Sequence, residues 1–170
     1  MMQVLLLLDK SSHTLLCEDL RDKIVRTLEL KGHQVDVCEL DKGDVFQCLG
    51  CLLCLTKHPD ECVNKDIVNE LRKKVKQYSA TFFLTPVLFG HYSSTMAGAI
   101  NRGAGSHDWQ VFIGYGEDIT GEEKQTFIDL VSKHRGAADI VHPGMDRKVD
   151  VFVTMSPEDN SKICEVMSYA

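Results

Sequence analysis

Four cysteines form a compact group whose spacing is suited to metal chemistry. Cys48, Cys51, Cys54 and Cys62 follow one another as C-x2-C-x2-C-x7-C. Cysteines with two residues between them supply thiolates that ligate iron in [4Fe–4S] clusters, whereas structural zinc sites usually pair two separated C-x2-4-C halves. Two interpretations stay open: a [4Fe–4S] site on all four cysteines, or thiols that pack the loop or form a reversible dithiol pair.

Hydroxyl groups gather directly after the first apolar run, in the segment DKSSHT. Ser11, Ser12 and Thr14 stand where a helix is expected to begin, and backbone N–H groups and the helix dipole favour a phosphate there. His13 adds a hydrogen-bond donor. The alternative is that these side chains only cap the helix. No GxGxxG or GxxxxGK[ST] pattern occurs here, which argues against a dinucleotide fingerprint and an NTPase loop.

An apolar segment stands where a polar loop would be ordinary, at Pro86, Val87, Leu88, Phe89 and Gly90. Such a loop suits a flat, mostly apolar ring held by side chains and backbone groups. Glycine at its end permits close approach or an unusual backbone angle. The alternative is that Leu88 and Phe89 fill a subunit interface or the local core.

A third candidate loop contains Gly114, Tyr115 and Gly116. Its glycines and aromatic ring could bring backbone and Tyr115 against the same ligand. An ordinary glycine turn with an exposed tyrosine is the alternative.

These loops must be positioned by strands and helices that alternate along the chain. Apolar runs predict strands, and four-residue steps or capping patterns predict helices. This alternation predicts an α/β fold: a five-stranded parallel sheet in flavodoxin-like order 2-1-3-4-5, with helices on both faces. The strands are expected at 4–8, 34–40, 81–85, 110–114 and 149–154, and the helices at 15–30, about 66–77, after His91, from Thr120 to about His134, and from Ser156-Pro157 onward.

Composition limits the classes of function. The chain has 170 residues, 44% of them hydrophobic, and a net charge of −6, so we expect one domain over residues 1–170. The acidic balance argues against nucleic-acid binding. The longest apolar run is far shorter than a membrane span, and the first residues do not resemble a signal peptide. Seven cysteines without an export signal therefore indicate the cytoplasm.

The segment TPVLFGHYSS closely resembles TPVYFGxYSS of flavodoxin-like NAD(P)H-dependent FMN reductases and iron–sulfur flavoproteins, and CLGCLLCLTKHPDECVNKD resembles their CxGCxxCxxKxPxxCxxxDD. The resemblance runs along nearly the whole chain. It implies FMN contacts at Pro86, Val87, Leu88, Phe89 and Gly90. Leu88 stands where the family often has tyrosine.

The first loop departs from the family, which often has Gly-Ser-Pro-Arg where this chain has Asp9-Lys10-Ser11-Ser12-His13-Thr14. The hydroxyls remain, but Asp9 would repel a phosphate unless it points away. This departure favours a member that uses FMN as a dissociable substrate.

The resemblance implies an FMN-dependent oxidoreductase that takes hydride from NAD(P)H and reduces a quinone, a flavin or another acceptor. The flavin carries the chemistry, so no catalytic side chain is nominated. One alternative is an iron–sulfur flavoprotein with a [4Fe–4S] cluster, reduced by a ferredoxin-like partner. The other is a degenerate scaffold without flavin. Family members commonly assemble as homo-dimers or homo-tetramers with FMN near a subunit interface.

Overall fold

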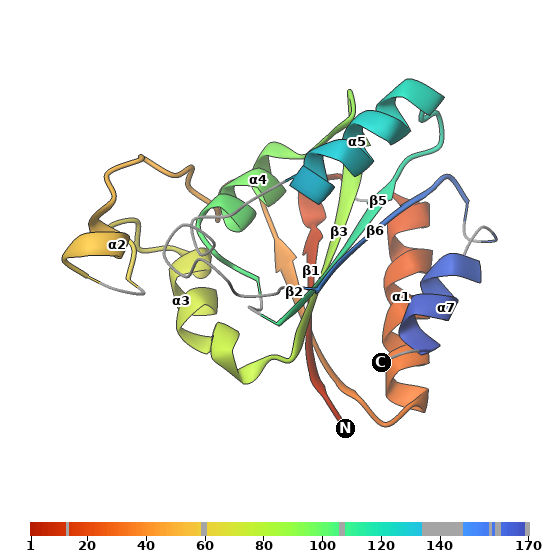
Figure 1. Ribbon diagram of the computed structural model, residues 1–170, viewed down its shortest axis with the longest axis horizontal. Coiled ribbons are helices and arrows are strands. Elements are labelled where there is room, and N and C mark those ends of the chain that lie inside the picture. Colours follow the sequence, from red (N-terminus) through yellow and green to blue (C-terminus); the bar gives the residue numbers. More distant parts are fainter. Residues whose placement is uncertain are drawn as a thin grey trace.

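The computed structural model describes residues 1–12, 14–58, 61–105, 108–133, 148–156, 158 and 161–168. Its five parallel strands form one sheet in the order β2-β1-β3-β5-β6, which is the predicted 2-1-3-4-5 order (Figure 1). A two-residue strand, β4, pairs antiparallel with the end of β3 and brings the described strands to six, one more than predicted. The strands are β1 (Gln3–Asp9), β2 (Gln34–Leu40), β3 (Ala80–Leu88), β4 (His91–Tyr92), β5 (Trp109–Tyr115) and β6 (Lys148–Thr154).

The central strands are buried on both faces, as their apolar runs predict. Every residue from Val4 to Leu8 on β1 is at most 1% exposed. β3 and β5 are likewise buried along most of their length, whereas most residues of the edge strand β2 are exposed or half-buried. The carboxyl ends of β1, β3 and β5 therefore lie side by side at the middle of the sheet.

Helices cover both faces of the sheet (Figure 1). One core joins the sheet to α1 (Leu15–Leu30) and α7 (Ser161–Ser168). The other joins it to α3 (Ile67–Lys74), α4 (Ser94–Asn101) and α5 (Gly121–Lys133). The four-residue steps predicted for α1 are confirmed, because its buried face is formed by Leu16, Cys17, Leu20, Ile24 and Leu28.

Polar side chains cap the starts of α1, α3, α4 and α5. The predicted capping box of α5 is present: Thr120 donates from its backbone N and Oγ1 to Glu123 Oε2 at 2.9 and 3.0 Å, and Glu123 N donates to Thr120 Oγ1 at 3.2 Å. The last helix differs, because α7 is described from Ser161 and Ser156 lies in a bend. Pro157, expected at its first turn, lies outside the described residues, as does His134 at the expected end of α5.

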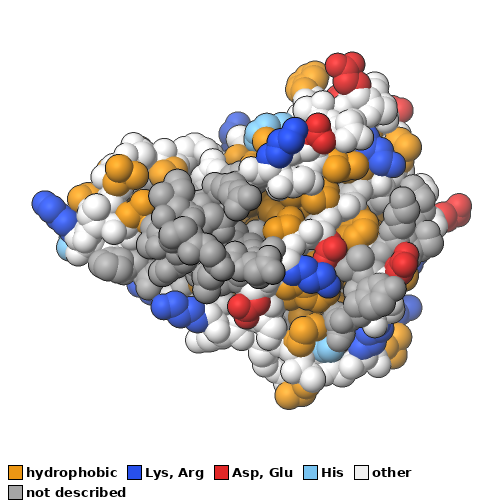
Figure 2. All heavy atoms as spheres, viewed as in Figure 1, with side chains coloured by type: hydrophobic (Ala, Val, Ile, Leu, Met, Phe, Trp, Pro, Cys, Tyr) orange, Lys and Arg blue, Asp and Glu red, His pale blue; other side chains and the backbone are white. Residues whose placement is uncertain are grey.

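Three short helical elements also lie within the described residues: η1 (Lys10–Ser12), η2 (Val75–Gln77) and α2 (Leu53–Thr56). The segment that carries α2, residues 46–58, projects from the sheet at the left of Figure 1. It exposes Phe46, Leu49 and Leu52, and Figure 2 shows hydrophobic side chains on this part of the surface. None of the helices in the described ranges is both long and apolar enough to cross a membrane.

Candidate functional site

Three of the predicted loops meet at the carboxyl edge of the sheet. Parallel pairing puts Leu8 beside Leu84, and Pro86 beside Tyr115. The loops that follow β1, β3 and β5 are therefore neighbours at the place where ligands bind in open α/β sheets. The helix dipole of α1 adds partial positive charge at this edge.

The first loop is held by a buried carboxylate. Asp9 is 0% exposed, and its Oδ1 accepts hydrogen bonds from Ser11 N at 2.9 Å and from Ser11 Oγ. Thr14 is the N-cap of α1, since its Oγ1 accepts from Cys17 N at 3.2 Å. Ser11 and Thr14 thus make internal hydrogen bonds. The side chain of Ser12 and the whole of His13 lie outside the part of the chain that the structure describes.

The second loop is a tight hairpin with an exposed apolar tip. Leu88 pairs with His91, so Phe89 and Gly90 form a two-residue turn. Phe89 is 93% exposed and Leu88 is 48% exposed, whereas Pro86 is buried and Val87 half-buried. This tip offers a ring-sized apolar surface at the edge of the sheet.

The turn itself is strained. Phe89 has φ 51° and Gly90 has φ 77°. Positive φ at both central residues is the pattern of a type I′ turn, in which Asn and Gly are the usual residues. Gly90 also packs on α5, because a Cβ there would lie 2.7 Å from the side chain of Thr126. An exposed phenylalanine in the left-handed region is rare and often marks a functional position.

The third loop is mostly packing. The ring of Tyr115 is 2% exposed and lies in the core against α1. Burial raises the pKa of Tyr115, and its hydrogen bond with Cys17 raises it further. A Cβ on Gly114 would lie 2.6 Å from Val87 Cγ2, and one on Gly116 would lie 3.0 Å from Ile119 Cγ1. Of these three residues, only Gly116 retains intermediate exposure.

The edge fits the two ends of FMN unequally. The exposed tip at Leu88 and Phe89 suits an isoalloxazine ring, whose faces are apolar. The first loop instead begins at a buried carboxylate, Asp9, whose Oδ2 has no hydrogen-bond partner among the described residues. That oxygen is an acceptor, and it does not match a phosphate.

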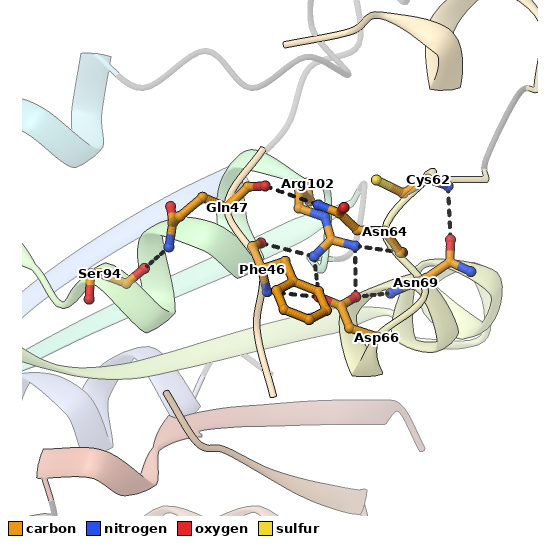
Figure 3. A network of polar contacts seen from close by, with 8 residues as sticks. All are labelled: Phe46, Gln47, Cys62, Asn64, Asp66, Asn69, Ser94 and Arg102. Atoms are coloured by element: carbon orange, nitrogen blue, oxygen red, sulfur yellow. Dashed lines mark hydrogen bonds and ion pairs between the residues drawn. The ribbon is translucent and has the colours of Figure 1, made fainter. Parts of the chain in front are cut away.

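A buried arginine holds the two ends of the cysteine-bearing segment (Figure 3). Arg102, at the end of α4, donates to Phe46 O at 3.0 Å and to Asn64 O at 3.1 Å. It also binds the carboxylate of Asp66 with two nitrogens, one of them 2.7 Å from Oδ1. Both side chains are buried, Arg102 at 1% and Asp66 at 4% exposure. The segment between residues 46 and 64 is therefore closed at its base.

The charges of this pair are strongly stabilised. Burial alone would raise the pKa of Asp66, but hydrogen bonds from Arg102 and from the backbone N–H groups of Phe46 and Asn69 hold it below its ordinary value. Burial lowers the pKa of Arg102, and its hydrogen bonds to Asp66 and Cys62 raise it by more. Both groups stay charged at neutral pH.

The four cysteines differ in their exposure to solvent. Cys48 and Cys51 are exposed and Cys54 is half-buried on the projecting segment, whereas Cys62 is buried at its base. Cys62 N donates to Asn69 Oδ1 at 2.8 Å, and Figure 3 shows its sulfur on the side of Arg102. Within the described ranges, no three His, Cys, Asp or Glu side chains are grouped to hold a metal ion. As arranged, the thiols do not fit a [4Fe–4S] cluster.

The buried ion pair of Arg102 and Asp66 could not be predicted from the sequence. Arg102 follows a helix of small residues and lies 36 positions from Asp66 and 56 from Phe46. No local spacing signals such a pair. The small residues were a partial signal: a Cβ on Gly98 would lie 2.9 Å from Val45 Cγ1, so glycine lets this segment pack against α4.

Comparison with solved structures shows the same fold. The chain resembles NAD(P)H:quinone oxidoreductase from Methanothermobacter marburgensis, with 16% identity, a TM-score of 0.58 and coverage of 98% of this chain and 90% of that one. It also resembles the flavoenzyme NAD(P)H:(acceptor) oxidoreductase FerB from Paracoccus denitrificans, with 13% identity, a TM-score of 0.60 and coverage of 99% and 94%.

Sequence comparison identifies the family. An iron–sulfur flavoprotein from Archaeoglobus fulgidus is 30% identical over 81 residues, which are 48% of this chain and 36% of that protein. A second from the same organism is 25% identical over 83 residues, or 49% and 40%. The chain thus spans well under half the length of these curated relatives. The family model of NADPH-dependent FMN reductase matches residues 2–121. The chain belongs to the NADPH-dependent FMN reductase family.

Proposed function

We propose that the chain is an FMN-binding oxidoreductase that passes electrons from NAD(P)H through FMN to a quinone, a flavin or another small acceptor. The observation that carries this proposal is the exposed, strained tip of Leu88 and Phe89 at the carboxyl edge of the sheet, in a chain of the FMN reductase family. We take residues 1–170 to act as one flavodoxin-like domain in the cytoplasm.

Each of the three loops would contact a different part of the flavin. Leu88 and Phe89 would cover the ring, while Pro86, Val87 and Gly90 set the shape of the hairpin behind them. Gly116 and the backbone beside Gly114 and Tyr115 would limit the other side of the ring. Ser11, Ser12, His13 and Thr14 would face the ribityl end.

The flavin supplies the redox chemistry when it is bound, by reversible transfer of hydride or single electrons. The protein binds the ring, orients it and excludes water beside the apolar tip. This division of labour needs no acid or base from the chain.

A flavin titration tests the proposal. We expect quenching of FMN fluorescence on binding at micromolar protein, and NADH or NADPH oxidation that depends on both FMN and an added quinone. Phe89→Ala should weaken binding about two- to tenfold, because one aromatic contact is lost. The matched control is Leu30→Ala, which removes another exposed apolar side chain at the opposite end of α1. Absence of flavin binding at tens of micromolar would favour the degenerate scaffold instead.

The second candidate is an iron–sulfur flavoprotein-type electron-transfer protein that receives electrons from a ferredoxin-like protein. The match to the iron–sulfur flavoproteins favours it, but Cys48, Cys51, Cys54 and Cys62 would have to come together on the projecting segment. Iron and acid-labile sulfide in anaerobically purified protein would support it. Their absence, with FMN bound, would leave the first proposal.

We also propose that the chain assembles as a homo-dimer or homo-tetramer, because the exposed tip of Leu88 and Phe89 would be shielded in an assembly. Light scattering during size-exclusion chromatography tests this: a mass near 19.1 kDa at micromolar protein would contradict it.

A further inference from the structure

A buried carboxylate stands where the flavin site would need to bind a phosphate. Asp9 ends β1, is 0% exposed, and begins the loop that leads into α1. Its Oδ2 has no hydrogen-bond partner in the part of the chain that the structure describes. A buried acceptor without a donor is costly. The carboxylate is therefore an unfavourable neighbour for a ligand that brings a further acceptor.

Ser11, one of the donors that a phosphate would use, is turned toward this carboxylate. Ser11 donates from both its backbone N and its Oγ to Asp9 Oδ1. The Thr14 hydroxyl oxygen accepts from Cys17 N as the helix cap. Ser11 could donate to an incoming phosphate only after its two hydrogen bonds to Asp9 were broken.

Nearby cations do not compensate for the negative charge. Lys10 Nζ lies 3.9 Å from Glu39 Oε2, and Arg21 Nη1 lies 3.5 Å from Glu39 Oε1, so both face the same carboxylate. The N-terminus of α1 contributes about half a positive charge, which is less than the full charge of Asp9. A phosphate dianion at this end would meet a buried like charge, which is unfavourable.

A neutral hydroxyl meets none of these obstacles. It carries no charge for Asp9 to repel, and it leaves the bonds from Ser11 in place. The ribityl chain of riboflavin ends in a hydroxyl where FMN has its phosphate. We propose that Asp9 fills the phosphate end of the flavin site, so that this chain binds riboflavin at least as tightly as FMN. This inference rests on the proposed function, because it concerns the same flavin site.

Parallel titrations of the unmodified protein with riboflavin and FMN test the inference without any substitution. We expect the dissociation constant of riboflavin to be equal to or below that of FMN, within about threefold. FMN binding more than about threefold tighter than riboflavin would overturn the inference and leave the proposed function intact. Failure of both flavins to bind would instead remove the proposed function, and the inference with it.

The variant Asp9→Asn locates the effect. Asparagine keeps an oxygen for Ser11 but removes the charge. FMN affinity should rise at least about tenfold, while riboflavin affinity changes less than about threefold. Asp22→Asn is the control, because it makes the same change in net charge at an exposed position on α1, and it should alter neither affinity. An unchanged FMN affinity in a folded Asp9→Asn protein would overturn the inference, and circular dichroism establishes the folding.

Discussion

Arg102 connects its own helix to two segments that are distant in the sequence, one through Phe46 O and the other through Asn64 O and the Asp66 carboxylate. Arg102→Ala would leave Asp66 buried and unpaired. Removing one partner of a buried ion pair typically costs about 3–5 kcal/mol. We expect a loss of that size in the free energy of unfolding, measured by urea denaturation.

The control for Arg102 is an exposed pair. Lys73 Nζ lies 2.9 Å from Glu70 Oε1, and both side chains are largely exposed. Lys73→Ala should cost below about 1 kcal/mol. Equal losses for the two variants would contradict a structural role for Arg102.

The same ion pair predicts a dependence on pH. The pKa of Asp66 in the folded protein lies below its ordinary value of 3.8. Its contribution to stability is therefore complete above that ordinary value and is lost as the pH falls through the lower, folded value. Asp66→Asn should be destabilised at pH 7, and the difference from the unmodified protein should shrink in acid. Urea denaturation at pH 7 and at stepwise lower pH measures this, and a constant difference would contradict it.

At the scale of elements, the proposed function predicts that Phe89, in the hairpin of β3 and β4, lowers stability and strengthens flavin binding. Phe89 is held at φ 51° although its side chain has almost no contact with the protein. Phe89→Asn suits the type I′ turn and should stabilise the fold by about 1 kcal/mol. It should weaken flavin binding about two- to tenfold, because the aromatic contact is lost. Thermal denaturation and flavin titration on one preparation measure both, and a change of the same sign in the two would contradict this role.

The contact between β5 and α5 depends on a glycine. A Cβ on Gly114 would lie 2.6 Å from Val87 Cγ2 and 2.9 Å from Phe127 Cε1. Gly114→Ala should therefore cost about 1–3 kcal/mol through overpacking. Gly43→Ala is a matched control, because a Cβ there meets nothing within 4 Å, and it should change stability by less than about 0.5 kcal/mol. A neutral effect at Gly114 would show that the hairpin moves easily.

Elements with local signals could be predicted from the sequence. The steps of α1 and the Thr120–Glu123 capping box are confirmed, because both depend on residues three or four positions apart. β4 was missed because two residues carry no periodicity. The sequence offers Tyr115 as a ligand contact or as an exposed residue of a turn, and its burial against Cys17 depends on packing with a distant helix, which local spacing does not show. The sequence predicted that the three loops follow β1, β3 and β5, but it could not show which of their side chains already form hydrogen bonds or pack within the protein.

At the scale of the whole molecule, the candidate site is joined to the most buried part of the sheet. Its loops follow β1, β3 and β5, whose hydrophobic residues contribute to both cores. A ligand that binds only the native arrangement of these loops must stabilise the whole fold. Flavin at a hundred times its dissociation constant should add about 2.7 kcal/mol and raise the melting temperature by roughly 5–10 °C for a chain of this size.

The control ligand for this shift is adenosine monophosphate, which carries a phosphate but no isoalloxazine ring. It should leave the melting temperature unchanged, because the first loop directs Ser11 toward Asp9 rather than outward. Differential scanning calorimetry over a range of ligand concentrations separates the outcomes. If flavin fluorescence reports binding but the melting temperature does not rise with flavin concentration, the flavin binds the unfolded chain as well, and the native edge of β1, β3 and β5 is not its site.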